Sequence, residues 1–90
     1  MYRIVLVSEG VPPASGEAGA RGIAEEFTHR SWHKNVKSEW DGSRIIIQAD
    51  NDFDSDGSAL ADEFSDAISA CVPGLFDRNI VVVSVTPTLL

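Results

Sequence analysis

Hydrophobic and polar residues follow one another along this chain in a pattern that predicts strands and helices in alternation. The aliphatic run from Tyr2 to Ser8 is typical of a central strand that is covered on part of both faces. Gly10 to Pro13 ends that strand, because proline offers no amide donor to a sheet. A helix is then expected from about Ser15 to about Ser31. Its apolar face would consist of Ala20, Ile23, Ala24 and Phe27.

The second half of the pattern begins with a β-hairpin. Two strand-like segments, 35–40 and 44–49, flank Asp41-Gly42, and an Asp-Gly pair supplies the positive φ angles that a tight hairpin turn needs. A second helix follows and should end at Pro73-Gly74. The last strand is expected from Asn79 to Thr86. The apolar face of the second helix would consist of Leu60, Phe64, Ala67, Ile68 and Cys71.

This order of elements indicates a fold class. Strand, helix, strand, strand, helix, strand, with right-handed crossovers, predicts an α+β ferredoxin-like β-α-β-β-α-β sandwich. Its four-stranded antiparallel sheet would have strand order 4-1-3-2, with both helices on one face. At 90 residues and 9.7 kDa, residues 1–90 are expected to form a single domain with one core.

Such a sheet has one face that the helices leave open, and the strands carry more aliphatic residues than one covered face requires. If Ile45 and Ile47 point to the helices, then Ile46 points away from them. An apolar patch with a polar rim is typical of an interaction surface, although β-branched residues are also common in strands for their propensity alone. We therefore expect a partner-binding surface made of Arg3, Val5, Val7, Arg44, Ile46, Gln48, Ile80 and Val82.

This surface leads to our main functional hypothesis. We expect a non-catalytic protein-interaction module that self-associates, as a homodimer or larger homo-oligomer, or docks a partner through the open sheet face. RNA-binding modules of similar architecture need aromatic side chains on the central strands and basic surroundings, which this chain lacks.

An acidic segment supports a second hypothesis, a calcium-binding domain. Residues 52–63 have the spacing of a calcium loop, with oxygen donors at the first, third and fifth places, Gly57 at the sixth and a glutamate at the twelfth. The alternative is that Asp54, Ser55 or Asp56 caps the second helix, and we favour it because a strand, not a helix, precedes the loop. The metal ligands would be Asp52, Asp54, Asp56, Ser58 and Glu63, and calcium is the one cofactor this pattern suggests.

The charge distribution supports a third hypothesis. The formal net charge is −7, and no Lys or Arg lies between Arg44 and Arg78. Such a surface repels a phosphate backbone, so we expect no nucleic-acid partner. An acidic inhibitor or immunity-type protein that blocks a basic site would fit the same charge.

The remaining features indicate little chemistry. The longest apolar runs are too short to span a bilayer, and the N-terminus lacks a secretory pattern, so we expect a cytoplasmic protein without a membrane partner. The glycines of the first helix, Gly16, Gly19 and Gly22, are expected to permit close packing and not to bind phosphate. His29 and His33 lack an evident third metal ligand, and no nucleophile stands in a recognisable motif, so we expect no enzyme activity.

Overall fold

The order of strands and helices predicted from the sequence is confirmed in the computed structural model, which describes residues 1–72 and 79–88. The elements are β1 (Tyr2–Glu9), α1 (Pro13–Phe27), β2 (Lys34–Trp40), β3 (Ile45–Asn51), α2 (Ser58–Cys71) and β4 (Asn79–Pro87). The expected helix stop at Pro73-Gly74 lies outside the described residues.

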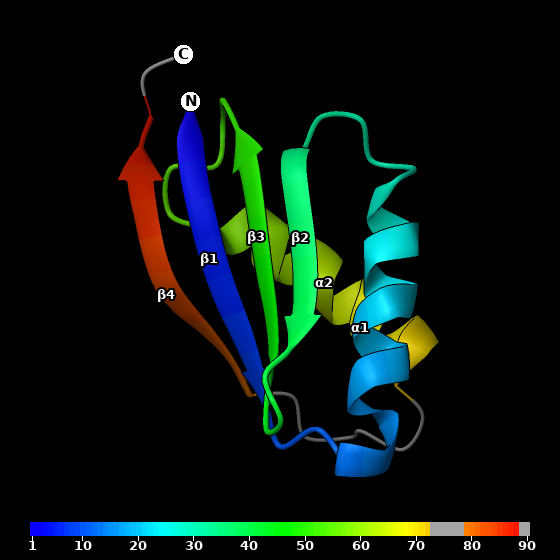
Figure 1. Cartoon of the computed structure of the whole chain (residues 1–90). Coiled ribbons are helices and arrows are strands. Elements are labelled where there is room, and N and C mark those ends of the chain that lie inside the picture. Colours follow the sequence, from blue (N-terminus) through cyan, green and yellow to red (C-terminus); the bar gives the residue numbers. More distant parts are fainter. Residues whose placement is uncertain (73–78, 89–90) are drawn as a thin grey trace.

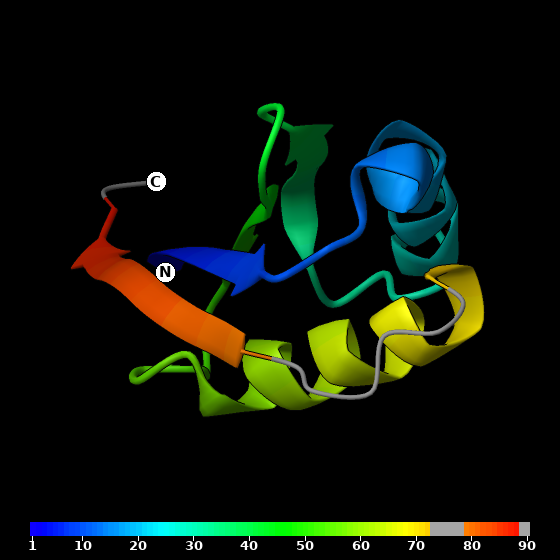
Figure 2. The ribbon, with the colours of Figure 1, turned by 90° about the horizontal axis from the view of Figure 1, so that it is seen from below.

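The four strands form one antiparallel sheet in the order β2-β3-β1-β4. β1 and β3 are the central strands, and β2 and β4 form the two edges (Figure 1). Both helices lie on one side of the sheet, with α1 beside β2 and α2 crossing behind the strands (Figures 1 and 2). This is the expected ferredoxin-like α+β arrangement, and it leaves the other side of the sheet open.

The hydrophobic core lies between the sheet and the helices. Ile4 and Leu6 of β1, and Ile45 and Ile47 of β3, have no solvent exposure because alternate strand residues point to the helix side. The helices contribute Ala20, Ile23 and Phe27 from α1 and Leu60, Phe64, Ala67 and Ile68 from α2. The apolar faces predicted from helical spacing are therefore those that the core uses, except that Ala24 and Cys71 are only half-buried.

Glycines allow α1 to pack closely against its neighbours. A Cβ at Gly16 would lie 2.3 Å from the indole ring of Trp40 in β2. A Cβ at Gly19 would lie 2.9 Å from the Val72 side chain, and one at Gly22 would lie 3.0 Å from the sulfur of Cys71. Real Cβ contacts are longer than the first two distances, so Gly16 and Gly19 are required for this packing.

Helix α1 ends at Phe27, so the predicted extension to Ser31 is wrong. The amides of Thr28, His29 and Arg30 each donate to a carbonyl three residues back, at 3.1 to 3.3 Å. This tighter bonding closes the helix without a glycine or proline. Neither of those residues occurs in the segment, so the sequence carried no signal for the stop.

The start of β1 and the end of β4 meet at one corner of the sheet. The amide of Thr88, just after β4, donates to the carbonyl oxygen of Met1 at 2.8 Å. Residue 1 and residue 88 are therefore neighbours in space.

Candidate interaction surface

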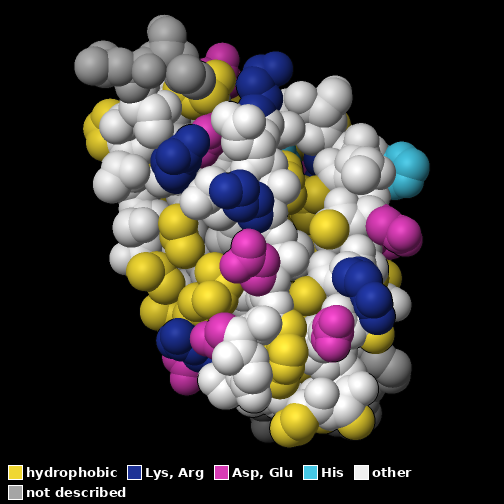
Figure 3. All heavy atoms as spheres, in the orientation of Figure 1, with side chains coloured by type: hydrophobic (Ala, Val, Ile, Leu, Met, Phe, Trp, Pro, Cys, Tyr) yellow, Lys and Arg dark blue, Asp and Glu magenta, His cyan; other side chains and the backbone are white. Residues whose placement is uncertain are grey.

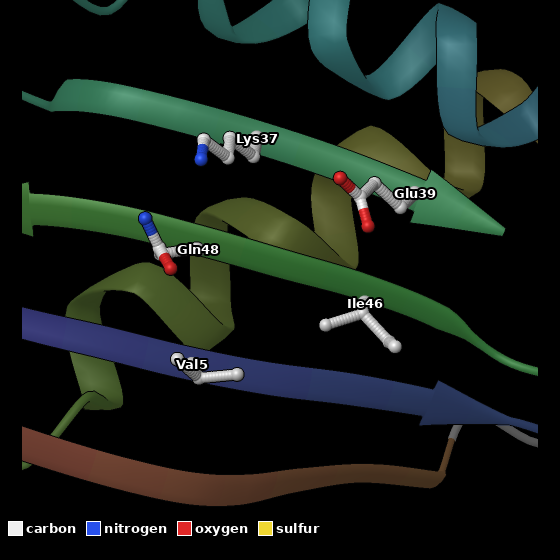
Figure 4. A pocket seen from close by; sticks show the side chains of 5 residues that line it. All are labelled: Val5, Lys37, Glu39, Ile46 and Gln48. Carbon is white, nitrogen blue, oxygen red and sulfur yellow. The ribbon is translucent and has the colours of Figure 1, made fainter. Parts of the chain in front are cut away.

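The open side of the sheet contains a hollow formed by the central strands and β2. In the register of the sheet, Val5 pairs with Gln48 and Val7 with Ile46. Directly paired residues of an antiparallel sheet point to the same face. The hollow has a volume of about 250 Å³, and Figure 4 shows its side chains rising from three adjacent strands. It is lined by Val5, Lys37, Glu39, Ile46 and Gln48.

The aliphatic residues expected on this side differ in their exposure. Val5 and Ile46 are half-buried and open to solvent at the hollow, as the sequence predicted. Val7 is only 4% exposed, although it lies on the same side. The exposed apolar patch is therefore narrower on β1 than expected.

The prediction that Ile80 and Val82 of β4 point to the open side of the sheet is wrong. Ile80 pairs with Ser8 and Val82 with Leu6, so both point to the helix side together with those buried residues. Val81 pairs with Val7, which lies on the open side, so Val81 is the β4 valine that points to the open side. The sequence of β4 is aliphatic at both alternating sets, so its facing could not be read from the pattern.

Three valines of β4 are nevertheless the large aliphatic side chains that are exposed in the described residues. Val81 is 39%, Val82 44% and Val83 57% exposed. Val83 lies at a shift of register between β1 and β4, a β-bulge that leaves it without a partner residue. In Figure 3, hydrophobic side chains gather in the lower left of the open side, over β1 and β4, with charged side chains above them.

Arg3 forms a bidentate ion pair on the open side. Its Nε and Nη2 atoms donate to the two oxygens of Asp50, each at 3.0 Å, and Asn35 donates to the same carboxylate at 2.9 Å. The hydrogen bonds from Arg3, helped by Asn35, hold the pKa of the Asp50 carboxyl below its ordinary value, against the effect of burial. Arg3 is thus present on the predicted surface, but its charge is already matched.

Arg44 lies in the turn between β2 and β3, where it is paired with Asp41. The guanidinium donates to the Asp41 carboxylate at 3.2 and 3.3 Å. The same carboxylate accepts the backbone amides of Ser43 and Arg44, and these two bonds lower the pKa of Asp41 to about 2. The hairpin predicted at Asp41-Gly42 is present, but of these two residues only Gly42, at φ +99°, has a positive φ. Arg44 therefore stabilises the hairpin at the margin of the surface.

The open side is neutral in an acidic molecule. The register and the hairpin place four basic and four acidic residues there, whereas the whole chain has a net charge of −7. The acidic excess therefore lies elsewhere, on the helices and the connection before α2. The basic residues are Arg3, Lys34, Lys37 and Arg44, and the acidic ones are Glu9, Glu39, Asp41 and Asp50.

The acidic segment 52–63 starts α2 and is not arranged around a metal ion. The Asp54 carboxylate accepts the amides of Ala59 at 3.2 Å and Leu60 at 2.9 Å, which caps the helix. Asp56 accepts the amide and hydroxyl of Ser58. Gly57, expected to permit the turn, has φ +81°. Within residues 1–72 and 79–88, no three His, Cys, Asp or Glu side chains lie close enough together to hold a metal.

Glu63, the expected twelfth ligand, is bound to the β2 side of the molecule. It forms an ion pair or hydrogen bond with His33, whose side chain is buried, and it accepts the Trp32 indole N–H at 3.1 Å. Arg30 lies 3.6 Å from the same carboxylate. The structure therefore separates Glu63 from Asp52 and Asp56.

Sequence reasoning missed this cluster. His33 also contacts Asn51, whose Nδ2 lies 3.3 Å from His33 Nδ1, and its ring centroid lies 5.6 Å from that of Phe27 and 6.2 Å from that of Phe53. His29 is exposed, so the two histidines do not act as a pair. Glu63 is thirty residues from His33 in the chain. The contact between His33 and Glu63 depends on how α2 crosses the sheet, so no local pattern in the sequence predicts it.

Comparisons with known proteins add no functional information. No family model, curated protein or solved structure matches this chain. No helix in the described part of the chain is long and apolar enough to cross a membrane. The single cysteine, Cys71, is half-buried, and burial together with Glu26 and Glu25 raises the pKa of its thiol, which disfavours the reactive thiolate.

Proposed function

We propose that this chain is a non-catalytic protein-interaction module that binds protein through the open side of its sheet, with a second copy of itself as the partner. The observation that carries the proposal is the hollow where Val5 and Ile46 lie open to solvent between Lys37, Glu39 and Gln48. An apolar centre surrounded by polar groups is the usual composition of a protein–protein contact. Burial of those aliphatic groups would supply the free energy of binding.

Charge supports a second copy as the partner. Two molecules that each carry a net charge of −7 repel one another over most of their surfaces. The open side, with equal numbers of basic and acidic residues, is where that repulsion is weakest. Lys37 and Glu39 also lie two residues apart on the open side of β2, so a two-fold contact that runs this strand antiparallel to its copy would bring each near its opposite charge in the other copy.

The open side favours protein over RNA. The side chains of β1 and β3 at the hollow are Val5, Ile46 and Gln48, and none is aromatic. RNA-binding sheets stack bases on aromatic residues at these places.

The test is the molar mass of the protein, measured by light scattering over a range of concentrations. We expect the molar mass to rise above the 9.7 kDa of one chain as the protein concentration rises. Ile46→Lys should weaken association by roughly tenfold or more, because it places a charge at the centre of the apolar contact. Ala18→Lys, on the exposed side of α1, adds the same charge away from the hollow and should leave association unchanged.

A monomer at every concentration would contradict the proposal in its self-associating form. An Ile46→Lys variant that associates as the wild type does would contradict the role of the open side. Circular dichroism of both variants checks that neither change unfolds the domain.

A further inference from the structure

The two edges of the sheet differ in how well they are protected. β4 extends over nine residues, Asn79–Pro87, and carries no charged side chain. In the described residues no strand or helix lies beyond it, so its outer backbone groups have no strand partner. A long aliphatic edge without charge is a ready template for pairing with another strand.

The β2 edge has the features that prevent such pairing. Its exposed residues include Lys34, Lys37 and Glu39. Asn35 adopts φ +53°, and the register with β3 shifts between Lys34 and Lys37. Helix α1 also packs alongside this strand. Charges, irregular backbone and a covering helix are the usual protections of an edge strand, and β4 has only its bulge and a terminal proline.

The composition of β4 points to a second copy of the same strand as its partner. A charged strand from another protein would find no opposite charge on Asn79–Pro87. Two copies of β4 bring no like charges together, although the whole molecules carry −7 each. A two-fold contact requires a surface that complements itself, and an uncharged row of β-branched side chains does so.

The bulge determines which part of β4 can pair. Before Val83 the side chains alternate regularly, with Ile80 and Val82 on the helix side and Val81 on the open side. An antiparallel pair centred on Val81 places Val81 opposite its own copy and Ile80 opposite Val82 of the other copy. Directly opposite residues then share a face from Ile80 to Val82, the part of the segment where the alternation is regular. Beyond the bulge this match of faces is lost.

We infer that segment 79–83 of β4 pairs antiparallel with the same segment of a second copy, across a two-fold axis near Val81. The two sheets join into one continuous sheet of eight strands, and the aliphatic side chains Val81, Val82 and Val83 become covered. The contact goes beyond the proposed function, because it uses the edge of the sheet and leaves the hollow around Ile46 free. The two open sides then form one larger surface.

The test uses the full chain with Ile46→Lys, which weakens the contact through the open side, so that association through the edge is measured against a reduced background. Sedimentation equilibrium should show a dimer of defined mass. Adding Val81→Lys should weaken that dimer by roughly tenfold or more, because two like charges then lie directly opposite each other. The matched control is Thr86→Lys, an exposed residue of the same strand beyond the bulge, which should have little effect.

Amide hydrogen exchange supplies a second readout that needs no change in β4. Alternate amides of an edge strand point outward, so pairing should slow the exchange of alternate amides in 79–83 as concentration rises. A monomeric Ile46→Lys variant, an aggregate without defined mass, or a dimer whose β4 exchange is unchanged would each overturn the inference. None of these results depends on whether Ile46→Lys weakens the wild-type association, so the proposed function stands or fails separately.

Discussion

The β2 side of the sheet and the β4 side differ in how closely a helix packs against them. On the β2 side, Gly16 allows α1 to lie directly against the Trp40 ring. On the β4 side, Val82 points toward α2 and yet remains 44% exposed. The closest approach there is at the start of α2, where a Cβ at Gly57 would lie 3.5 Å from the Val82 side chain.

This difference shows that topology alone does not decide burial. On each side the chain runs from a strand through a helix to a second strand. However, α1 carries Gly16, Gly19 and Gly22 toward its neighbours, whereas α2 contains no glycine. Small residues shorten the distance between packed elements, and a small domain has few other ways to cover its apolar surface. The β2 side, which α1 covers closely, supports stability. The β4 side, where Val81, Val82 and Val83 stay exposed, is the bare side and is available for contact with another molecule.

The largest expected effect compares the truncation of one aliphatic side chain to alanine on each of the two sides. Ile45→Ala removes a side chain with no exposure from beneath α1 and should lower the free energy of unfolding by about 2–5 kcal/mol. Val82→Ala on the bare side should lower it by less than about 1 kcal/mol, because water already reaches this side chain. Urea denaturation at low protein concentration measures both. Equal losses of unfolding free energy in the two variants would show that β4 is as well packed as β3.

A smaller effect tests the close contact on the β2 side. Gly16→Ala should lower the free energy of unfolding by about 1–2 kcal/mol, because the clash with Trp40 exceeds alanine's better helix propensity. In a Trp40→Ala background the clash is absent, and the same change should be neutral or stabilising by up to about 1 kcal/mol. A double-mutant cycle by thermal denaturation measures this coupling. Zero coupling would mean that Trp40 does not need the glycine.

The smallest effect concerns the start of α2 on the bare side. Asp54→Ala should lower the free energy of unfolding by about 1 kcal/mol, because Ala59 and Leu60 lose their capping acceptor. Asp52→Ala, at an exposed neighbour, should change it by less than about 0.5 kcal/mol. Calcium chloride should leave the Tm of the wild type unchanged. A rise in Tm that Asp52→Ala abolishes would restore the calcium-loop hypothesis.

The sequence predicted what local patterns determine. The element order, the hairpin at Asp41-Gly42 and the buried faces of both helices followed from periodicity and turn residues, and the structure confirms them. The facing of β4 did not follow, because valines occupy both alternating sets and the bulge at Val83 shifts the register. The contact of His33 with Glu63 did not follow either, because it joins distant segments that only the completed fold brings together.

The hydrogen bond from Thr88 to Met1 has a practical consequence for the order of the chain. A short peptide link between these two positions would span almost no distance, and the exposed hairpin at Gly42 offers a place to open new ends. A circularly permuted protein cut there should keep the same sheet. It would place residues 1 and 88 in a closed loop and leave the outer edge of β4 free of any tag or fusion.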